Sequence, residues 1–307
     1  MFSKHALAVK CVASFYPVLQ RLSRHKGMEY VSIFLFHEVT DNPSKFQLIS
    51  GNYTSKENFE ACLFWISENF DVVDLKKLRD CKRAITKPLA AITFDDSWQG
   101  QNDAIRHIVD KYNYPVHIFL NLGTVVSGLD VAASLTYYGS STPTLLKILD
   151  KTVIEEMKTK DFLEWQGPVM SMDIVSELSK VTGVTFGNHS YHHYPASSLS
   201  IDTFKLNVQY NQRALEDLPN FELNYAFTYG RPDIDYNNEH IEVLLNLGYK
   251  QVYSADGLIN KLPVNVRSSI SRVNFSPADA KDSDFWWATY KSVLKNSIQG
   301  LNRRNQS

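Results

Sequence analysis

Two short apolar runs in this sequence are each followed closely by side chains that can bind a metal. The first run, residues 88–94, leads into Asp95 and Asp96, and the second, residues 184–186, is followed by His189 and His193. Short apolar runs of this kind are typical of buried strands. In a parallel α/β barrel the carboxyl ends of the strands meet at one face. We therefore expect two carboxylates and two imidazoles to lie together at that face.

These side chains are suited to a catalytic metal site. Zinc binds imidazole and carboxylate groups, and a catalytic zinc keeps three protein ligands and one open position. Two histidines and one aspartate would supply the ligands, and the second aspartate would remain as a base. The four-residue spacing of His189 and His193 predicts that they share one face of a helical turn. His192 would then point elsewhere, behind the ligands or at the surface.

The rest of the sequence alternates between strand and helix patterns, which favours a parallel sheet. We expect strands at 31–36, 72–73, 89–94, 116–120, 184–186, 225–227, 251–254 and 270–275. We expect helices at 58–69, 102–112, 145–160, 172–180, 201–218, 238–247 and 285–298. No internal repeat or interdomain linker interrupts this pattern, so one parallel (β/α) barrel is predicted.

The two leading motifs resemble those of the polysaccharide deacetylases that share the NodB homology domain. Residues 93–97, Thr-Phe-Asp-Asp-Ser, are similar to a Thr-Phe-Asp-Asp-Gly segment, and residues 189–193 to a His-Ser/Thr-x-x-x-His segment. Weaker similarities extend over residues 31–275 and include segments 55–59, 71–75, 226–230, 247–250 and 271–273. The resemblance implies an α/β fold, a distorted parallel (β/α) barrel of the NodB type in a single domain.

The resemblance also implies a role for each residue of the two motifs. Asp95 would be the general base, and Asp96, His189 and His193 would bind a divalent metal. Zn²⁺ is the expected ion, with Co²⁺, Mn²⁺ and Ni²⁺ as alternatives. Ser97 stands where the family usually has glycine, so either the backbone φ there is not positive or strain is tolerated.

Three further residues receive candidate roles from the resemblance. The backbone N–H of Tyr229 would stabilise the oxyanion, although Thr228 replaces the usual proline before it. Arg272 would keep the base aspartate ionised, with a surface salt bridge as the alternative. The family often places its acid on a late histidine, but this chain has none after His240. Its first strand ends in His37, as in the permuted poly-N-acetylglucosamine deacetylase subgroup. His37 is thus the candidate acid, and a core histidine bonded to a backbone carbonyl is the alternative.

Composition limits the partners and the compartment. The formal net charge is −1, so nothing in it favours a nucleic-acid partner. Three scattered cysteines predict a reducing compartment. Residues 1–28 are basic and amphipathic, and Lys10 interrupts their apolar run, which argues against a signal peptide. This helix would pack on the barrel or lie on a membrane surface. We expect the barrel at 29–300, a polar tail at 301–307, and a location in the cytoplasm, at the inner face of the membrane in the second case.

The predicted function is metal-dependent hydrolysis of acetyl groups from N-acetylated sugars. The substrate would be a surface polysaccharide or its glycan or sugar precursor. A polysaccharide O-acetyl esterase is one alternative, because the same site hydrolyses esters. A non-catalytic carbohydrate-binding pseudoenzyme is the other. Metal content and acetate release separate the pseudoenzyme from the enzymes, and the choice of an amide or an ester substrate separates the two enzymes.

Overall fold

The computed structural model of the chain describes residues 30–82, 86–138 and 158–274. The basic helix predicted at 1–28, the closing helix at 285–298 and the polar tail at 301–307 lie outside the described residues. The predicted helix at 145–160 lies almost wholly outside them as well.

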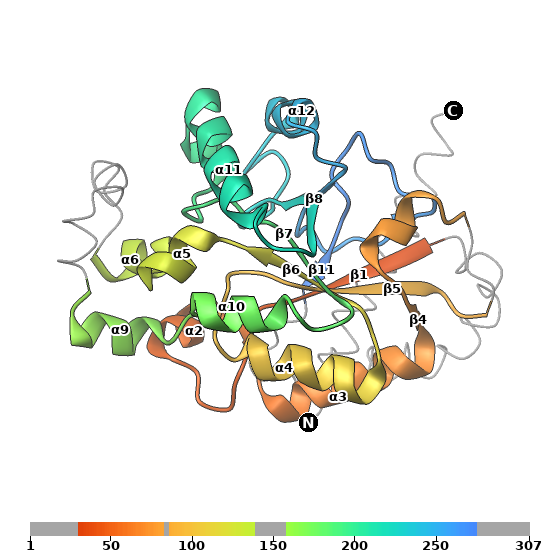
Figure 1. The fold of residues 1–307 in the computed structure, drawn as a ribbon, viewed down its shortest axis with the longest axis horizontal. Coiled ribbons are helices and arrows are strands. Elements are labelled where there is room, and N and C mark those ends of the chain that lie inside the picture. Colours follow the sequence, from red (N-terminus) through yellow and green to blue (C-terminus); the bar gives the residue numbers. More distant parts are fainter. Residues whose placement is uncertain (1–29, 83–85, 139–157, 275–307) are drawn as a thin grey trace, which may run out of the picture.

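The centre of the fold is a curled sheet whose main strands run parallel (Figure 1). Its strands follow the order β10, β1, β5, β6, β7, β8, β9, with β4 beside β5 and β11 beside β1. Their bounds are β1 Tyr30–Phe36, β4 Asp71–Val72, β5 Leu89–Phe94, β6 Val116–Leu120, β7 Val184–Asn188, β8 Phe221–Ala226, β9 Gln251–Tyr253, β10 Asn260–Lys261 and β11 Val273–Asn274. A separate small sheet pairs β2 (Glu38–Val39) with β3 (Tyr53–Thr54). The predicted strands therefore exist, in parallel order.

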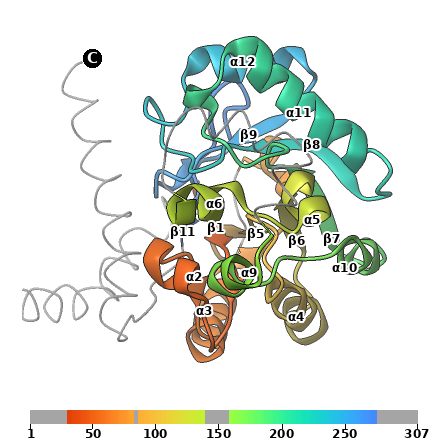
Figure 2. The same ribbon diagram turned by 90° about the vertical axis from the view of Figure 1, so that its left-hand side faces the viewer.

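Residues 270–274 close the sheet into a distorted barrel. Ile270 forms a parallel bridge with Tyr253 of β9, and Val273 pairs with Phe34 of β1. The same segment therefore contacts β9, at one end of the strand order, and β1, the first of the parallel strands near the other end. Figure 2 views the barrel from the end at which β6 leads into α5 (Leu122–Ser127). The single strand predicted at 270–275 is thus split into a bridge and the short β11.

Helices surround this barrel along its sides and at the end where β6 leads into α5 (Figures 1 and 2). Besides α5 they are α2 Lys45–Ser50, α3 Lys56–Asn69, α4 Gln101–His107, α6 Val131–Tyr138, α9 Lys160–Gln166, α10 Met172–Leu178, α11 Ile201–Leu215 and α12 Asn238–Asn246. Two 3₁₀ turns, η1 Leu75–Arg79 and η3 Ala196–Ser198, and a π turn, η2 Ile108–Tyr112, complete the elements. Serine side chains cap the start of several helices, as Ser55 does for α3 and Ser200 for α11. No helix of the described ranges is long and apolar enough to cross a membrane.

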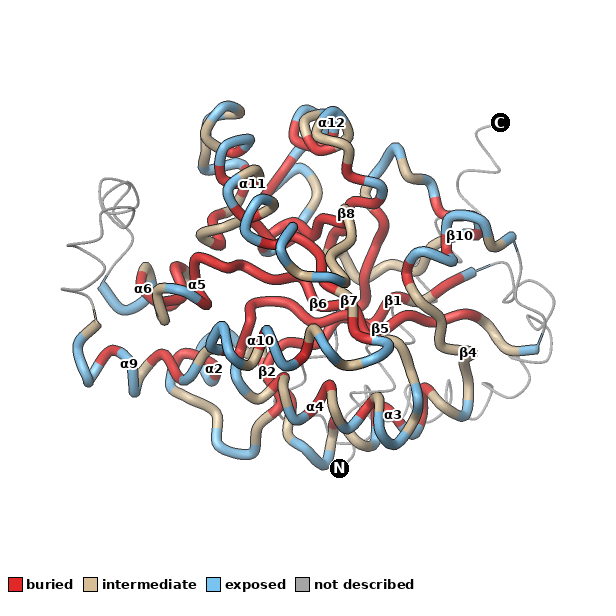
Figure 3. The backbone as a smooth tube through the Cα atoms, in the orientation of Figure 1, coloured by how far each residue is buried: buried red, intermediate tan, exposed pale blue. Residues whose placement is uncertain are grey.

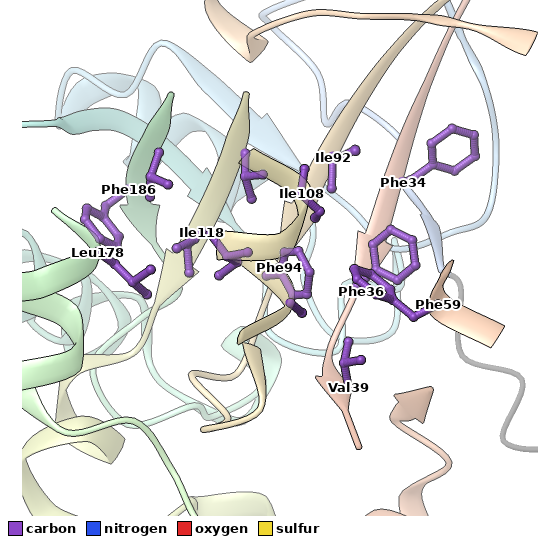
Figure 4. Packing of buried hydrophobic residues seen from close by; sticks show 14 of the residues in the cluster. Phe34, Phe36, Val39, Phe59, Ile92, Phe94, Ile108, Ile118, Leu178 and Phe186 are labelled. Atoms are coloured by element: carbon purple, nitrogen blue, oxygen red, sulfur yellow. The ribbon is translucent and has the colours of Figure 1, made fainter. Parts of the chain in front are cut away.

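Strand side chains alternate between two cores, and this alternation aims the functional residues. Along β5, Ile92 and Phe94 join a cluster beneath α3, α4 and α10. Figure 4 shows part of that cluster, including Phe36 of β1 against Phe59 of α3. Leu89 and Ala91, at the alternate positions of the same strand, belong instead to the cluster inside the barrel. The period of two therefore directs Asp95, just after β5, toward the interior. Figure 3 shows that the central strands β5 and β6 are buried along their whole length.

Candidate metal centre

The candidate site lies where β1, β5 and β7 end. The backbone continues the sheet pairing one residue past the strands, since the Asp95 N–H donates to the Phe36 carbonyl at 3.1 Å. The His189 N–H likewise donates to the Leu120 carbonyl at 3.0 Å. These bonds hold both residues in register at the same edge of the sheet. The strand ends thus fix the positions of the side chains before any ligand binds.

The structure brings together the three residues that the sequence predicts as metal ligands. One ligand atom from each of Asp96, His189 and His193 lies within 4.8 Å of the others, and all three residues are buried. The Nε2 atom of His193 is 2.9 Å from Asp96 Oδ1, and that of His189 is 3.3 Å from the same oxygen. Asp96 is therefore the point on which both imidazoles converge.

Left-handed backbone at several non-glycine residues builds this convergence. Among the described residues seven non-glycine residues have positive φ, and five of them lie at the site: Asp96, Ser97, Ser190, His193 and Tyr229. Such conformations cost on the order of 1–3 kcal/mol each and are typical of functional sites. At Asp96, φ is 71°, which turns the side chain back over the mouth of the barrel although strand alternation would point it outward.

The helical turn predicted for the histidine pair is wrong. Residues 189–195 contain no helix. His189 and His193 meet because φ is 62° at Ser190 and 57° at His193, which folds the loop back on itself. His192, predicted to lie behind the ligands or at the surface, is half-buried, and its ring packs 4.6 Å from that of Tyr191. Burial lowers the pKa of His192 to about 4.

Ser97 stands where the family usually has glycine, and its backbone shows which of the two expected alternatives holds. Its φ is 59°, so the strained conformation is present and tolerated. The Ser97 hydroxyl donates to Asn121 Oδ1 at 2.7 Å and accepts the Asn121 N–H at 3.3 Å. These bonds tie the aspartate loop to the residue that follows β6, which offsets part of the backbone cost.

The two histidines are oriented so that they fit a bound cation. His189 Nδ1 lies 2.9 Å from the Ala226 carbonyl, and His193 Nδ1 lies 2.9 Å from Asp130 Oδ2. Both partners can only accept, so each Nδ1 carries a proton, and in the neutral ring each Nε2 is left with its lone pair on the side of Asp96. A cation, either a proton or a metal ion, is then needed between Nε2 and the carboxylate oxygen at these distances. The donor set therefore suits a divalent metal.

The charges of the cluster also favour a bound cation. Burial alone would lower the pKa of His193, but the carboxylates of Asp96 and Asp130 hold it well above its usual value. Burial would raise the pKa of Asp96, yet His193 and His37 keep it well below its usual value. The site thus holds ionised oxygen atoms that attract a cation even though solvent is largely excluded.

Arg272 holds the carboxylate of Asp95 in a buried bidentate pair. The two N–H···O distances are each 2.7 Å, and Arg272 is 0 % exposed. Its Nε donates to the Ser254 carbonyl at 2.9 Å, and its guanidinium lies 5.1 Å from the centre of the Phe119 ring. Burial would raise the pKa of Asp95, but this guanidinium holds it below its usual value. Arg272 is therefore no surface salt bridge.

His37 and Tyr229 lie at the edges of the cluster. His37 Nε2 is 3.8 Å from Asp96 Oδ2, on the side away from the contact with His193 through Oδ1. Burial lowers the pKa of His37, and the charge of Asp96 opposes that shift in part. The Tyr229 ring stacks on the His193 ring at 5.5 Å and 8°, and the residue is 42 % exposed.

The backbone at Tyr229 forms a tight turn that leaves its N–H available. The Gly230 N–H donates to the Thr228 carbonyl at 2.7 Å across Tyr229, whose φ is 60°. The Tyr229 N–H donates to no group of the part of the chain that the structure describes. The Thr228 hydroxyl, present where the family has proline, donates to the Tyr194 carbonyl and anchors the turn. A free donor at this position can bind a ligand oxygen.

Asp130 is the one residue of this centre that sequence reasoning missed. It follows α5 and contacts His193, yet no motif surrounds it in the sequence. Its only sequence indication was its place in the long segment after β6, where barrel loops carry functional residues.

Comparison with known proteins identifies the family. The polysaccharide deacetylase family model matches residues 82–252, more than half of the chain. The chain therefore belongs to the polysaccharide deacetylase family, and this membership supports carbohydrate deacetylation by hydrolysis. No curated protein sequence matches the chain.

Solved structures show the same fold. The deacetylase PplD of Streptococcus pyogenes, in complex with acetate, matches with a TM-score of 0.59 at 15 % identity, over 85 % of this chain and 97 % of PplD. IcaB from Ammonifex degensii matches with a TM-score of 0.57 at 15 % identity, over 85 % of this chain and 97 % of IcaB. A de-N-acetylase from Aggregatibacter actinomycetemcomitans matches with a TM-score of 0.57 at 12 % identity, over 83 % of this chain and 99 % of the de-N-acetylase. The predicted NodB-type barrel is confirmed.

Substitution of Arg272 by glutamine should destabilise the protein strongly, because it leaves the Asp95 carboxylate buried without its partner. We expect a loss of about 3–5 kcal/mol in the free energy of unfolding at pH 7. The pKa of Asp95 is lowered in the folded state, so the pair stabilises the fold above the unfolded-state pKa of about 3.9. That stability is lost as the pH falls through the folded-state pKa.

Urea denaturation of the metal-free protein at several pH values measures this effect. Arg106→Gln is the matched control, because Arg106 pairs with Glu177 at 3.0 Å on the exposed surface and should contribute less than about 1 kcal/mol. Equal losses in the two variants would show that the buried pair does not hold the fold together.

Proposed function

We propose that this chain is a metal-dependent hydrolase that removes acetyl groups from the N-acetylated sugars of a surface polysaccharide or its precursor. The observation that carries the proposal is the convergence of Asp96, His189 and His193 beside a carboxylate held by Arg272. Family membership supports deacetylation. Two proteins of similar structure, a deacetylase and a de-N-acetylase, support the same chemistry.

Asp96, His189 and His193 would hold the divalent cation, and Zn²⁺ is the ion we expect, with Co²⁺, Mn²⁺ and Ni²⁺ as alternatives. Bound there, the cation would polarise the acetyl carbonyl and lower the pKa of the attacking water. The protein's own part is to hold a ring proton of each imidazole on Nδ1, so that Nε2 is the atom left for the cation, and to exclude bulk solvent. The hydrogen bonds at the two Nδ1 atoms and the burial of all three residues support this role.

Asp95 is the proposed general base. Its Oδ2 lies 3.7 Å from His189 Nε2, next to the ligand cluster, but Asp96 is the carboxylate on which both imidazoles converge. The bidentate contact with Arg272 uses one lone pair on each oxygen and leaves another free to accept a proton. Because Arg272 lowers its pKa, Asp95 is ionised at neutral pH and ready to accept the proton of the attacking water.

Tyr229 and His37 complete the proposed reaction. The free N–H of Tyr229 would donate to the oxyanion that forms when water adds to the carbonyl. His37 Nε2 would then give a proton to the departing nitrogen, because an amine leaves poorly as an anion. Burial lowers the pKa of His37, and an imidazolium with a lowered pKa is a stronger acid.

Two other functions remain as alternatives. A polysaccharide O-acetyl esterase would use the same residues with less need of His37. A carbohydrate-binding pseudoenzyme would keep the barrel without turnover. The cytoplasmic location and the membrane contact of residues 1–28 stay predictions.

Acetate release tests the proposed function directly. Protein loaded with Zn²⁺ is incubated with matched N-acetylated and O-acetylated glycans, and free acetate is measured. The proposal expects release from the N-acetylated members, and release only from the O-acetylated members would favour the esterase. Metal binding without any acetate release would favour the pseudoenzyme.

Alanine substitution of the histidine ligands should abolish metal binding. We expect one divalent ion per chain in the wild type and strong loss of that ion in His189→Ala and His193→Ala. Wild-type binding should weaken toward acid pH, because only neutral imidazoles bind the metal. Metal content after dialysis measures this. His192→Ala is the control, since its ring packs against Tyr191 and should leave the content unchanged. A double His189, His193 variant that retains full occupancy would contradict the ligand assignment.

Asp95→Asn should separate metal binding from turnover. The amide is nearly the same size as the carboxylate but cannot accept a proton from water, so acetate release should fall by about 10²–10⁴-fold. Metal content should stay close to one ion per chain. Near-normal acetate release with bound metal would mean that another group is the base.

His37→Ala should impair amide hydrolysis more than ester hydrolysis. An alkoxide is the easier leaving group, so the loss of a positioned acid, about 10²–10⁴-fold for the amide, should be smaller for the ester. Rates on matched amide and ester substrates at constant metal content measure the difference. His107→Ala, at an exposed ion pair with Glu60, is the control. Equal losses on both substrates would exclude His37 as the acid.

A further inference from the structure

Asp130 is a fully buried carboxylate to which the proposed reaction assigns no step. It lies between α5 and α6 and is 0 % exposed. Its two oxygen atoms have different partners. Oδ2 is 2.9 Å from His193 Nδ1, and Oδ1 accepts the Ala133 N–H at 2.8 Å at the start of α6. One side chain therefore contacts a predicted metal ligand and caps a helix.

The backbone of Asp130 is itself held in place by α9. The Asp130 N–H donates to the side-chain oxygen of Gln166 at 2.7 Å. Gln166 is buried, and its Nε2 donates to the carbonyls of Gly128 and Gly167 at 3.0 and 3.2 Å. The carboxylate has little freedom to move away from His193, because its backbone and both of its oxygens are fixed.

These contacts set the state of the His193 ring. A carboxylate oxygen only accepts hydrogen bonds, so the proton of the neutral ring must lie on Nδ1. Nε2 then presents its lone pair, and it faces Asp96 Oδ1 at 2.9 Å. A histidine that binds a metal needs this tautomer, and outer contacts of this kind raise its basicity and fix its orientation.

We propose that Asp130 is a positioning residue of the metal site, whose carboxylate fixes His193 in the Nδ1–H tautomer and aims Nε2 at the metal position. The inference rests on the proposed function, in which His193 is a ligand. It extends that function to a residue outside the family motifs and connects the site to α6 and α9.

A comparison with His189 shows why Asp130 is the more useful position for a substitution. His189 Nδ1 donates to the backbone carbonyl of Ala226, which no side-chain substitution removes. Asp130 holds His193 through a side chain, so its chemistry can be inverted without changing either ligand.

Asp130→Asn inverts that chemistry with little change in volume. If the amide oxygen keeps the contact with the Ala133 N–H, the NH₂ group faces His193 Nδ1 and requires a lone pair there. The ring proton then moves to Nε2, where it blocks metal binding. In serine proteases the same Asp→Asn change beside the catalytic histidine also leaves the ring in the wrong tautomer. If the amide rotates, its NH₂ opposes the Ala133 N–H and the cap is lost.

The experiment is a titration of the metal-free full chain with Zn²⁺ in competition with a chelating dye. We expect Asp130→Asn to bind about 10–100-fold more weakly than the wild type. Nitrogen NMR of the His193 ring, at a pH at which the ring is neutral, should show the proton moved from Nδ1 to Nε2, a change that a purely structural role would not produce. Asp74→Asn is the matched control, because Asp74 also caps a helical turn, at the Lys76 N–H, and does not contact the ligands.

A second variant guards against poor folding of the first. Asp130→Ser keeps a good helix cap but is too short to hold His193 Nδ1, and it should also weaken Zn²⁺ binding. Wild-type affinity in both variants would overturn the inference and leave the proposed function intact. A wild type that binds no Zn²⁺ would overturn both.

Discussion

The buried ion pair between Arg272 and Asp95 is the interaction on which the rest of the structure depends. Arg272 lies within residues 270–274, the segment that bridges β9 to β1 and completes the barrel. Asp95 lies at the end of β5, across the interior. Two charges buried this deeply are tolerable only as a pair. The segment that closes the barrel therefore also supplies the countercharge that keeps the Asp95 carboxylate ionised.

The ligand cluster shows how the protein distributes the cost of such a site. Asp96 and His193 adopt left-handed backbone, and carboxylates crowd a region with almost no solvent. Hydrogen bonds to Asp130 and Asn121 hold the strained His193 and Ser97 in place from outside, and a bond to Ala226 holds His189. Local strain and charge repulsion are thus balanced by the surrounding scaffold, as expected where a protein keeps a site ready for a ligand.

The sequence predicted the elements whose physical basis is local. The apolar runs, each followed by polar side chains, were sufficient to predict β5 and β7. They were also sufficient to predict that Asp96, His189 and His193 lie close together. The loop geometry was not predictable, because left-handed φ at Ser190 and His193 is imposed by tertiary contacts rather than by residue type. Asp130 escaped notice for a similar reason. Its proposed role depends on a contact with a residue 63 positions away, and neither composition nor spacing indicates such a contact.

The closure by residues 270–274 also governs the order in which the site can be assembled. Asp95 and Arg272 are 177 positions apart, so most of the chain must be synthesised and folded before they meet. Until then the Asp95 carboxylate has no buried countercharge and the barrel interior is open to water. Long-range pairing of this kind slows folding, because the entropy of closing the loop is lost before any contact compensates for it. The arrangement of Asp95, Asp96, His189 and His193 should therefore be completed in the last cooperative step of folding, so that an incomplete chain contains these four residues without bringing them together.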